Sequence, residues 1–137
     1  MIVWGGWRFA GPWTNTGAMY CVNGAAAGGI PGSVDGLQVA KNGGQLDLVW
    51  SPSCSADASN YAVYEGTLGD WTDHMPVTCT TGGAVSTSVT PASGSVYYLI
   101  APENTTVEGS YGTDSEGFER TTSPAACMAV QDTTTCP

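Results

Sequence analysis

Residues 94–120, GSVYYLIAPENTTVEGSYGTDSEGFER, contain the most strand-like run of this chain and its most clearly marked turn. Val96, Tyr98 and Ile100 alternate along the run with Tyr97 and Leu99. Such alternation of β-branched and aromatic side chains favours the pleated conformation and predicts a central strand. Because Pro102 cannot donate a hydrogen bond to a ladder, the strand should end near Ala101, and a second strand should run back from about Ser110.

Composition and charge narrow the range of partners. The 137 residues fit one domain with a single core. Charged residues make up only 11%, and 12 acidic against 3 basic side chains leave a formal net charge of −9. Such a chain repels phosphate backbones and anionic lipid heads, so we expect neither nucleic acid nor a membrane surface as partner. No apolar run approaches the roughly 18 residues of a membrane span, so no membrane insertion is expected.

Cysteine usage indicates the compartment. Five cysteines without a CxxC pair, accompanied by the single histidine His74, indicate an oxidising compartment rather than a zinc site. Met1 is not followed by a basic stretch and a long apolar one, so it does not begin a signal peptide. We therefore expect a mature or truncated piece of a secreted or cell-surface protein.

The first 22 residues predict a separate β-hairpin. Apolar strands are expected at residues 1–4 and 18–22, with turn-forming residues between them. The sequence IVWGG followed by NTGAMY resembles half a blade of a kelch-type propeller. One copy cannot build a propeller, so the hairpin is either the edge of a larger one or has another use. Residues 23–33, rich in glycine and alanine, are expected to link it to the next domain.

Short alternating segments recur about every ten residues from Asp35 onward. They lie at residues 37–39, 46–50, 61–64, 77–79, 85–89 and 96–101, and the strand from Ser110 completes seven. This spacing predicts an all-β fold, a seven-stranded antiparallel sandwich. We expect it to occupy residues 34–126, followed by a cysteine-containing tail at residues 127–137.

Six motifs follow one another in this domain. They are DGLxV at residues 35–39, LxLxW at 46–50, YxVY at 61–64, VxP at 89–91, YYLIxPxN at 97–104 and GSYG at 109–112. Together they make residues 34–122 resemble a fibronectin type III domain, an immunoglobulin-like sandwich. The resemblance implies that Trp50, Tyr61 and Tyr98 are core residues of the second, third and sixth strands. Leu48 and Ile100 share the faces of Trp50 and Tyr98 and are expected in the same core.

Two further stretches refine the resemblance. YEGTLGDW at residues 64–71 and EGSYGTDS at 108–115 are similar to type III-like modules of large secreted bacterial proteins. Such modules often accompany propellers or hydrolases. The chain has no Arg-Gly-Asp sequence, so integrin-type adhesion is not expected.

The resemblance also implies a disulfide. In this fold the second and fifth strands are neighbours, Cys54 lies just past the second, and Cys79 lies at the start of the fifth, so we expect Cys54 to bond Cys79. Two of the other three cysteines should form a second bridge. Cys21 with Cys127 or Cys136 would tie the hairpin to the tail, whereas Cys127 with Cys136 would close a small loop. A bridge from Cys21 is favoured, and one of the five cysteines is then expected to have no partner within the chain.

No constellation for catalysis or metal binding stands out. His74 lies near Asp70 and Asp73, but the chain has neither GxSxG nor a glycine-rich phosphate loop, so we expect a solvated loop histidine and no enzyme activity. The acidic pairs Asp70 with Asp73 and Asp114 with Glu116 lack calcium-loop spacing. No metal or other cofactor is expected.

Several aromatic residues have no place in a sandwich of this size. We expect an interaction surface that includes Ile2, Trp4, Trp7, Trp13, Tyr20 and Trp71. These side chains either cover the docked hairpin or a neighbouring chain, which we favour, or stack on sugar rings. A sugar platform requires two exposed and roughly coplanar rings.

These observations predict a non-catalytic extracellular structural or assembly module. Its partners would be neighbouring subunits or an upstream domain of the same protein, and its N-terminal hairpin would make it a subunit of an extracellular filament. The alternative function is an accessory carbohydrate-binding module of a secreted hydrolase.

Overall fold

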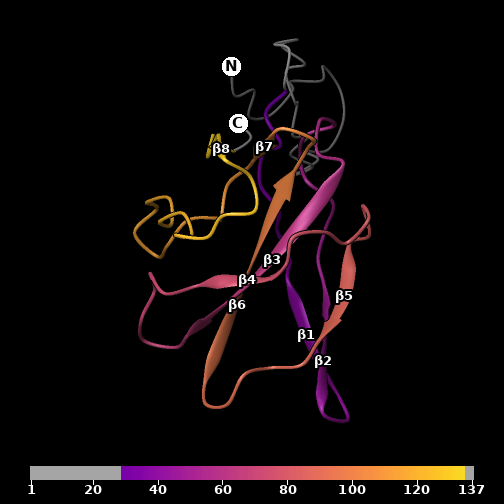
Figure 1. The fold of residues 1–137 in the computed structure, drawn as a ribbon, viewed down its shortest axis with the longest axis vertical. Coiled ribbons are helices and arrows are strands. Elements are labelled where there is room, and N and C mark those ends of the chain that lie inside the picture. Colours follow the sequence, from indigo (N-terminus) through magenta and orange to yellow (C-terminus); the bar gives the residue numbers. More distant parts are fainter. Residues whose placement is uncertain (1–28, 135–137) are drawn as a thin grey trace, which may run out of the picture.

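The computed structural model describes residues 29–134, which form two β-sheets without any helix (Figure 1). The three-stranded sheet has the spatial order β1 (Gln38–Asn42), β2 (Gln45–Val49) and β5 (Ser86–Val89). The five-stranded sheet has the order β4 (Met75–Thr78), β3 (Asn60–Thr67), β6 (Val96–Glu103), β7 (Val107–Glu108) and β8 (Val130–Gln131). The predicted all-β sandwich is confirmed, but the described residues form eight strands rather than seven, and β7 pairs with β8 in parallel rather than antiparallel. No described segment offers a helix that could span a membrane.

The pairing of β3 with β6 is the longest in the molecule. The two antiparallel strands match over their whole length, from Asn60 opposite Glu103 to Thr67 opposite Val96. Because side chains alternate along both strands, each pair of opposite residues shares one face of the sheet. One face meets the three-stranded sheet, and the other meets the chain that follows β7 (Figure 1).

The inner face carries the main core. Its buried members are Leu48, Trp50, Tyr61, Val63, Val89 and Ile100, with Tyr98 partly buried against them. The indole of Trp50 meets the ring of Tyr61 edge to face, with ring centroids 5.6 Å apart. Leucine and tryptophan from β2 and its end therefore pack between valine, isoleucine and tyrosine from β3 and β6.

The outer face of the five-stranded sheet is also buried. Ala62, Tyr64, Leu99 and Ala101 form a second cluster with Tyr111. Tyr111 belongs to the orange-to-yellow segment of Figure 1, which lies on the side of this sheet opposite the three-stranded sheet. The described part of the molecule thus has three layers, with the segment of residues 109–129, between β7 and β8, as the third.

Two expected strand limits are wrong. β6 extends through Pro102 to Glu103, because the nitrogen of Pro102 points away from β3 and no ladder donor is lost there. The expected strand from Ser110 is absent, since β7 ends at Glu108 and the chain leaves the sheet. A side chain on Gly109 would overlap the carbonyl of Gly32, so a glycine lets the chain turn away at this point.

The end of the predicted linker is docked on the sandwich. The Gly29 carbonyl accepts a hydrogen bond from the Asn104 side chain at 2.6 Å, and the Gly32 carbonyl accepts one from the Ser110 amide at 2.9 Å. The predicted hairpin of residues 1–22 lies outside the described residues. So do its expected interaction residues Ile2, Trp4, Trp7, Trp13 and Tyr20.

Trp50→Ala should lower the free energy of unfolding by about 3 to 5 kcal/mol, because it leaves a cavity between the sheets. Trp50→Phe should cost less, since the indole N–H has no hydrogen-bond partner among the described residues. Urea unfolding followed by circular dichroism measures both changes. Equal stability of wild type and Trp50→Ala would contradict the buried position of Trp50, which is 3% exposed.

Candidate functional site

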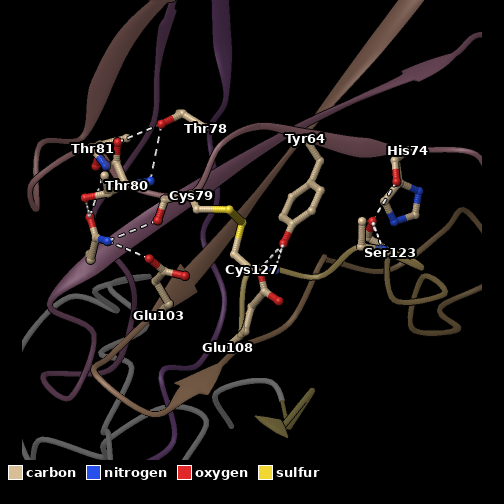
Figure 2. The surroundings of a disulfide bond; sticks show 12 residues. Tyr64, His74, Thr78, Cys79, Thr80, Thr81, Glu103, Glu108, Ser123 and Cys127 are labelled. Atoms are coloured by element: carbon tan, nitrogen blue, oxygen red, sulfur yellow. Dashed lines mark hydrogen bonds between the residues drawn. A yellow bond between two sulfur atoms is a disulfide. The ribbon is translucent and has the colours of Figure 1, made fainter. Parts of the chain in front are cut away.

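A disulfide joins the outer segment to the five-stranded sheet. Cys79 directly follows β4 and bonds Cys127, with Cα atoms 5.4 Å apart (Figure 2). The expected Cys54–Cys79 bridge is therefore wrong. Residues 75–78 pair with β3 in the five-stranded sheet, so Cys79 does not lie at the start of a strand beside β2.

The other cysteines are placed in part. Cys54 is also disulfide-bonded, and its sulfur lies 3.5 Å from the Ser33 carbonyl. Cys127 bonds Cys79, so of the two bridges considered for Cys21 the one to Cys127 is wrong. Cys21 and Cys136 lie outside the described residues. The Cys79–Cys127 bond spans 48 residues, and in the chain-entropy account a loop of that length contributes about 4 kcal/mol.

A buried carboxyl group lies at the centre of the contact between sheet and outer segment. The carboxyl group of Glu108 accepts a hydrogen bond from the hydroxyl of Tyr64 (Figure 2). It accepts a second from the hydroxyl of Tyr111 at 3.0 Å. The Tyr64 hydroxyl in turn accepts one from the Cys127 amide at 2.9 Å. Burial, followed by the interaction with Glu108, raises the pKa of Tyr64, so its hydroxyl stays protonated as a donor. These bonds fix the outer segment at the position of the disulfide.

His74 lies in the same layer, and the expectation of a solvated loop histidine is wrong. Its side chain is fully buried, and its ring centroid lies 5.4 Å from that of Tyr111. Nδ1 of His74 lies 3.1 Å from the hydroxyl of Tyr97. Burial lowers the pKa of His74 below its ordinary value, so the neutral form is favoured here. The residue acts as a ring packed among tyrosines.

A glycine makes room for this arrangement. Gly66 on β3 lies directly opposite Tyr97 on β6, and a Cβ at Gly66 would overlap the Tyr97 ring. Tyr97 therefore lies across the backbone of β3 and presents its hydroxyl to His74. An alanine at residue 66 would displace the ring and break that contact.

Glu103 is a second buried carboxyl group, directly opposite Glu108 in the pairing of β6 with β7. One oxygen accepts a hydrogen bond from the Asn60 side chain at 2.5 Å, and the other has no partner among the described residues. Burial and then the charge of Glu108 raise the pKa of Glu103 to about 7, although the hydrogen bond from Asn60 acts in the opposite direction. Glu103 is thus protonated in much of the folded protein near neutral pH.

The acidic loops use their oxygens internally. The Asp73 carboxylate accepts a hydrogen bond from the Thr67 amide at 2.9 Å. Hydrogen bonds from Thr67 lower the pKa of Asp73. The Asp114 side chain accepts hydrogen bonds from the amides of Glu116 and Phe118, and these bonds close a turn. Within residues 29–134, no three histidine, cysteine or acidic side chains come together as metal ligands.

Trp71 is the one expected interaction residue that the structure describes. Its ring is 50% exposed and stands beside a cleft of about 530 Å³. Thr72 and two short stretches, residues 114–116 and 119–121, form the remaining walls. The Trp71 ring lies 5.0 Å from that of Tyr97 at an angle of 47°, so the two rings are not coplanar.

Sequence reasoning missed the buried polar group of Tyr64, His74, Glu103, Glu108 and Tyr111. The apolar residues on both faces of residues 96–100 were the available signal, because a strand with two apolar faces must be covered on both sides. Nothing in the sequence indicated that a non-strand segment supplies the second cover.

The stability of the protein should depend on the ionisation of Glu103. The raised pKa means that the folded protein holds this proton more tightly than the unfolded chain, whose pKa is near 4.5. The contribution of Glu103 to stability is therefore complete below pH 4.5 and is lost as the pH rises through about 7. Glu103→Gln keeps an acceptor for Asn60 and removes the titration. Relative to wild type, its free energy of unfolding should rise by roughly 1–3 kcal/mol between pH 4 and pH 8.

Denaturant unfolding at a series of pH values measures this difference. The control is Glu116→Gln, which removes the same charge from an exposed position. Between pH 4 and pH 8, Glu103→Gln should gain more stability relative to wild type than this control does. A constant difference for Glu103→Gln would show that Glu103 titrates normally in the folded protein.

Neither the protein-family models, the curated proteins nor the solved structures contain a match for this chain.

Proposed function

We propose that this chain is a non-catalytic structural module of a secreted or cell-surface protein, and that it assembles with neighbouring subunits through its N-terminal hairpin. The observation that carries the proposal is the apolar character of the sheet edges. Val39 on β1, Val77 on β4 and Val130 on β8 are 53%, 43% and 56% exposed. Exposed edges with apolar side chains favour the addition of a strand from another chain.

The sheet order supports a fibronectin type III-like domain. That fold places its second and fifth strands side by side, and here β2 pairs with β5. The third and sixth strands pair in the opposite sheet, as β3 and β6 do. Domains of this kind commonly act as spacers and assembly units, which agrees with the proposal.

The placement of the titratable groups supports a non-catalytic role. The side chains of His74, Glu103 and Glu108 are all fully buried, and none of the three lines the cleft beside Trp71. A general acid or base must reach a substrate, and these side chains instead connect layers of the protein. The Cys79–Cys127 disulfide agrees with an oxidising, extracellular setting.

Deleting residues 1–22 should leave a folded sandwich that no longer assembles, because the six buried residues of the main core lie between Leu48 and Ile100, outside the deleted segment. Light scattering over a range of protein concentrations measures the assembly state, and circular dichroism checks the fold. A full chain that stays monomeric at all concentrations, or a deletion variant that assembles as the full chain does, would contradict the proposal.

A carbohydrate-binding module is the second candidate, and the exposed ring of Trp71 beside the cleft favours it. Indole faces stack on sugar rings, and the cleft walls offer hydroxyl and carboxyl groups as hydrogen-bond partners. The angle between Trp71 and Tyr97 excludes that pair as a flat platform. One sugar ring on Trp71 alone is the arrangement that remains.

Trp71→Ala should abolish retention on insoluble polysaccharide if this second candidate is correct. Sedimentation with cellulose, chitin and xylan measures the bound fraction. Phe118→Ala is the control, because Phe118 is 67% exposed but does not line the cleft. Absence of binding by the wild type, or equal binding by Trp71→Ala, would eliminate this candidate.

A further inference from the structure

Within residues 29–134, no strand pairs with one edge of β6 along most of its length. On the side away from β3, β7 pairs with it only where Glu103 lies opposite Glu108, near the tip of the β6 arrow in Figure 1. The Gly109 amide bonds the Pro102 carbonyl, after which the chain leaves. Between Val96 and Ala101, no described strand continues the sheet on this side.

The register shows which backbone groups face this edge. The Leu68 amide donates a hydrogen bond to the Ser95 carbonyl on the β3 side. On the other side, the Pro102 carbonyl accepts a hydrogen bond from the amide of Gly109, directly after β7. Because antiparallel residues alternate in direction, Tyr98 and Ile100 point their N–H and C=O groups away from β3. Neither residue has a backbone hydrogen bond on that side within residues 29–134.

An exposed apolar side chain of β1 borders the same edge. Val39 pairs with Leu48 and so shares its inner face, yet Val39 is 53% exposed while Leu48 is fully buried. The segment leading into β1 lies beside β7, since the Gly32 carbonyl accepts the Ser110 amide. β1 and the unpaired edge of β6 are therefore on one side of the sandwich. A strand beside β6 would cover Val39.

The other edges are less suited to a new strand. β4 contains Pro76, which lacks an amide donor, and β8 has only two residues. β5 is formed largely of serine and threonine, and β1 carries Lys41 near its end. Charged residues and proline are the common means of protecting an edge. The β6 edge has neither between Val96 and Ala101.

The occupant is a strand of residues 1–22. The described chain begins at Gly29, which Asn104 holds just beyond the end of β6. If residues 18–22 form the strand antiparallel to β6, that strand would end beside Val96, about 24 Å from Glu103 at about 3.4 Å per residue. Residues 23–28 would reach back over that distance only when fully extended, whereas a glycine-rich linker of this length spans about 15 Å on average. A second copy of the chain has no such restriction.

Charge also favours this occupant. Arg8 is the only charged side chain in residues 1–22, in a chain whose net charge is −9. The segment itself therefore has a net positive charge and approaches the acidic sandwich of another copy without repulsion.

We propose that the N-terminal hairpin of one copy adds a strand antiparallel to β6 of a second copy, in line with β7, and covers Val39. This inference rests on the proposed function and names its acceptor surface. Strand addition of this kind supplies main-chain hydrogen bonds to Tyr98 and Ile100 and buries apolar side chains between β1 and β6.

A matched pair of variants tests the acceptor surface in the full chain. Val39→Lys places a charge beside the β6 edge. Val49→Lys places the same charge on the opposite face of the same sheet, where Val49 is 47% exposed. Sedimentation velocity should show Val39→Lys as a monomer at concentrations where the wild type and Val49→Lys assemble. Assembly of Val39→Lys at the wild-type level would overturn the inference.

Amide hydrogen exchange provides a second readout. The Tyr98 amide should exchange at least tenfold more slowly in assembled wild type than in monomeric Val39→Lys, because strand addition gives it an acceptor. If deletion of residues 1–22 abolishes assembly but Tyr98 exchange does not change, the proposed function stands and the β6 acceptor is wrong. A wild type that is monomeric under all conditions overturns both.

Discussion

The antiparallel pairing of β3 with β6 is the contact on which the rest of the described structure depends. Among the described residues these are the only long strands, with eight residues each, and both the three-stranded sheet and the outer segment pack on them. Tyr61 and Ile100 lie in the inner core, whereas Tyr64 and Leu99 lie under the outer segment. A one-residue shift in register would exchange these two sets of side chains, so both layers specify the same pairing.

The outer layer requires its polar groups to be satisfied inside the protein. A buried hydroxyl or carboxyl group without a partner costs free energy, and here Tyr64 and Tyr111 both donate to Glu108. The Cys79–Cys127 bond holds the segment where these bonds form. The chain that covers this face is the chain that would otherwise have continued along β6, so burial of the outer face and the unpaired edge of β6 have one cause.

Much of the sandwich could be predicted from the sequence, because alternation with period two depends on local side chains. The strands around Trp50, Tyr61 and Ile100 carry that pattern directly. The positions of Cys127 and His74 could not be predicted, because they depend on a long segment without periodicity that folds over the sheet. The Cys54–Cys79 pairing failed for a related reason, since it required residues 77–79 to lie in the other sheet.

The proposed contact joins two different surfaces, the N-terminal hairpin of one copy and the β6 edge of another, and this difference determines the kind of assembly. Each copy would donate a hairpin at one place and accept one at another, so the interface is heterologous rather than self-complementary. Such contacts produce rings when the rotation between copies closes and open chains when it does not. Pro76 in β4 and the serine- and threonine-rich β5 make those edges weaker acceptors than β6, which would favour linear addition over branching. If the proposed contact forms and does not close into a ring, copies of the chain would join into a linear polymer of one repeating subunit.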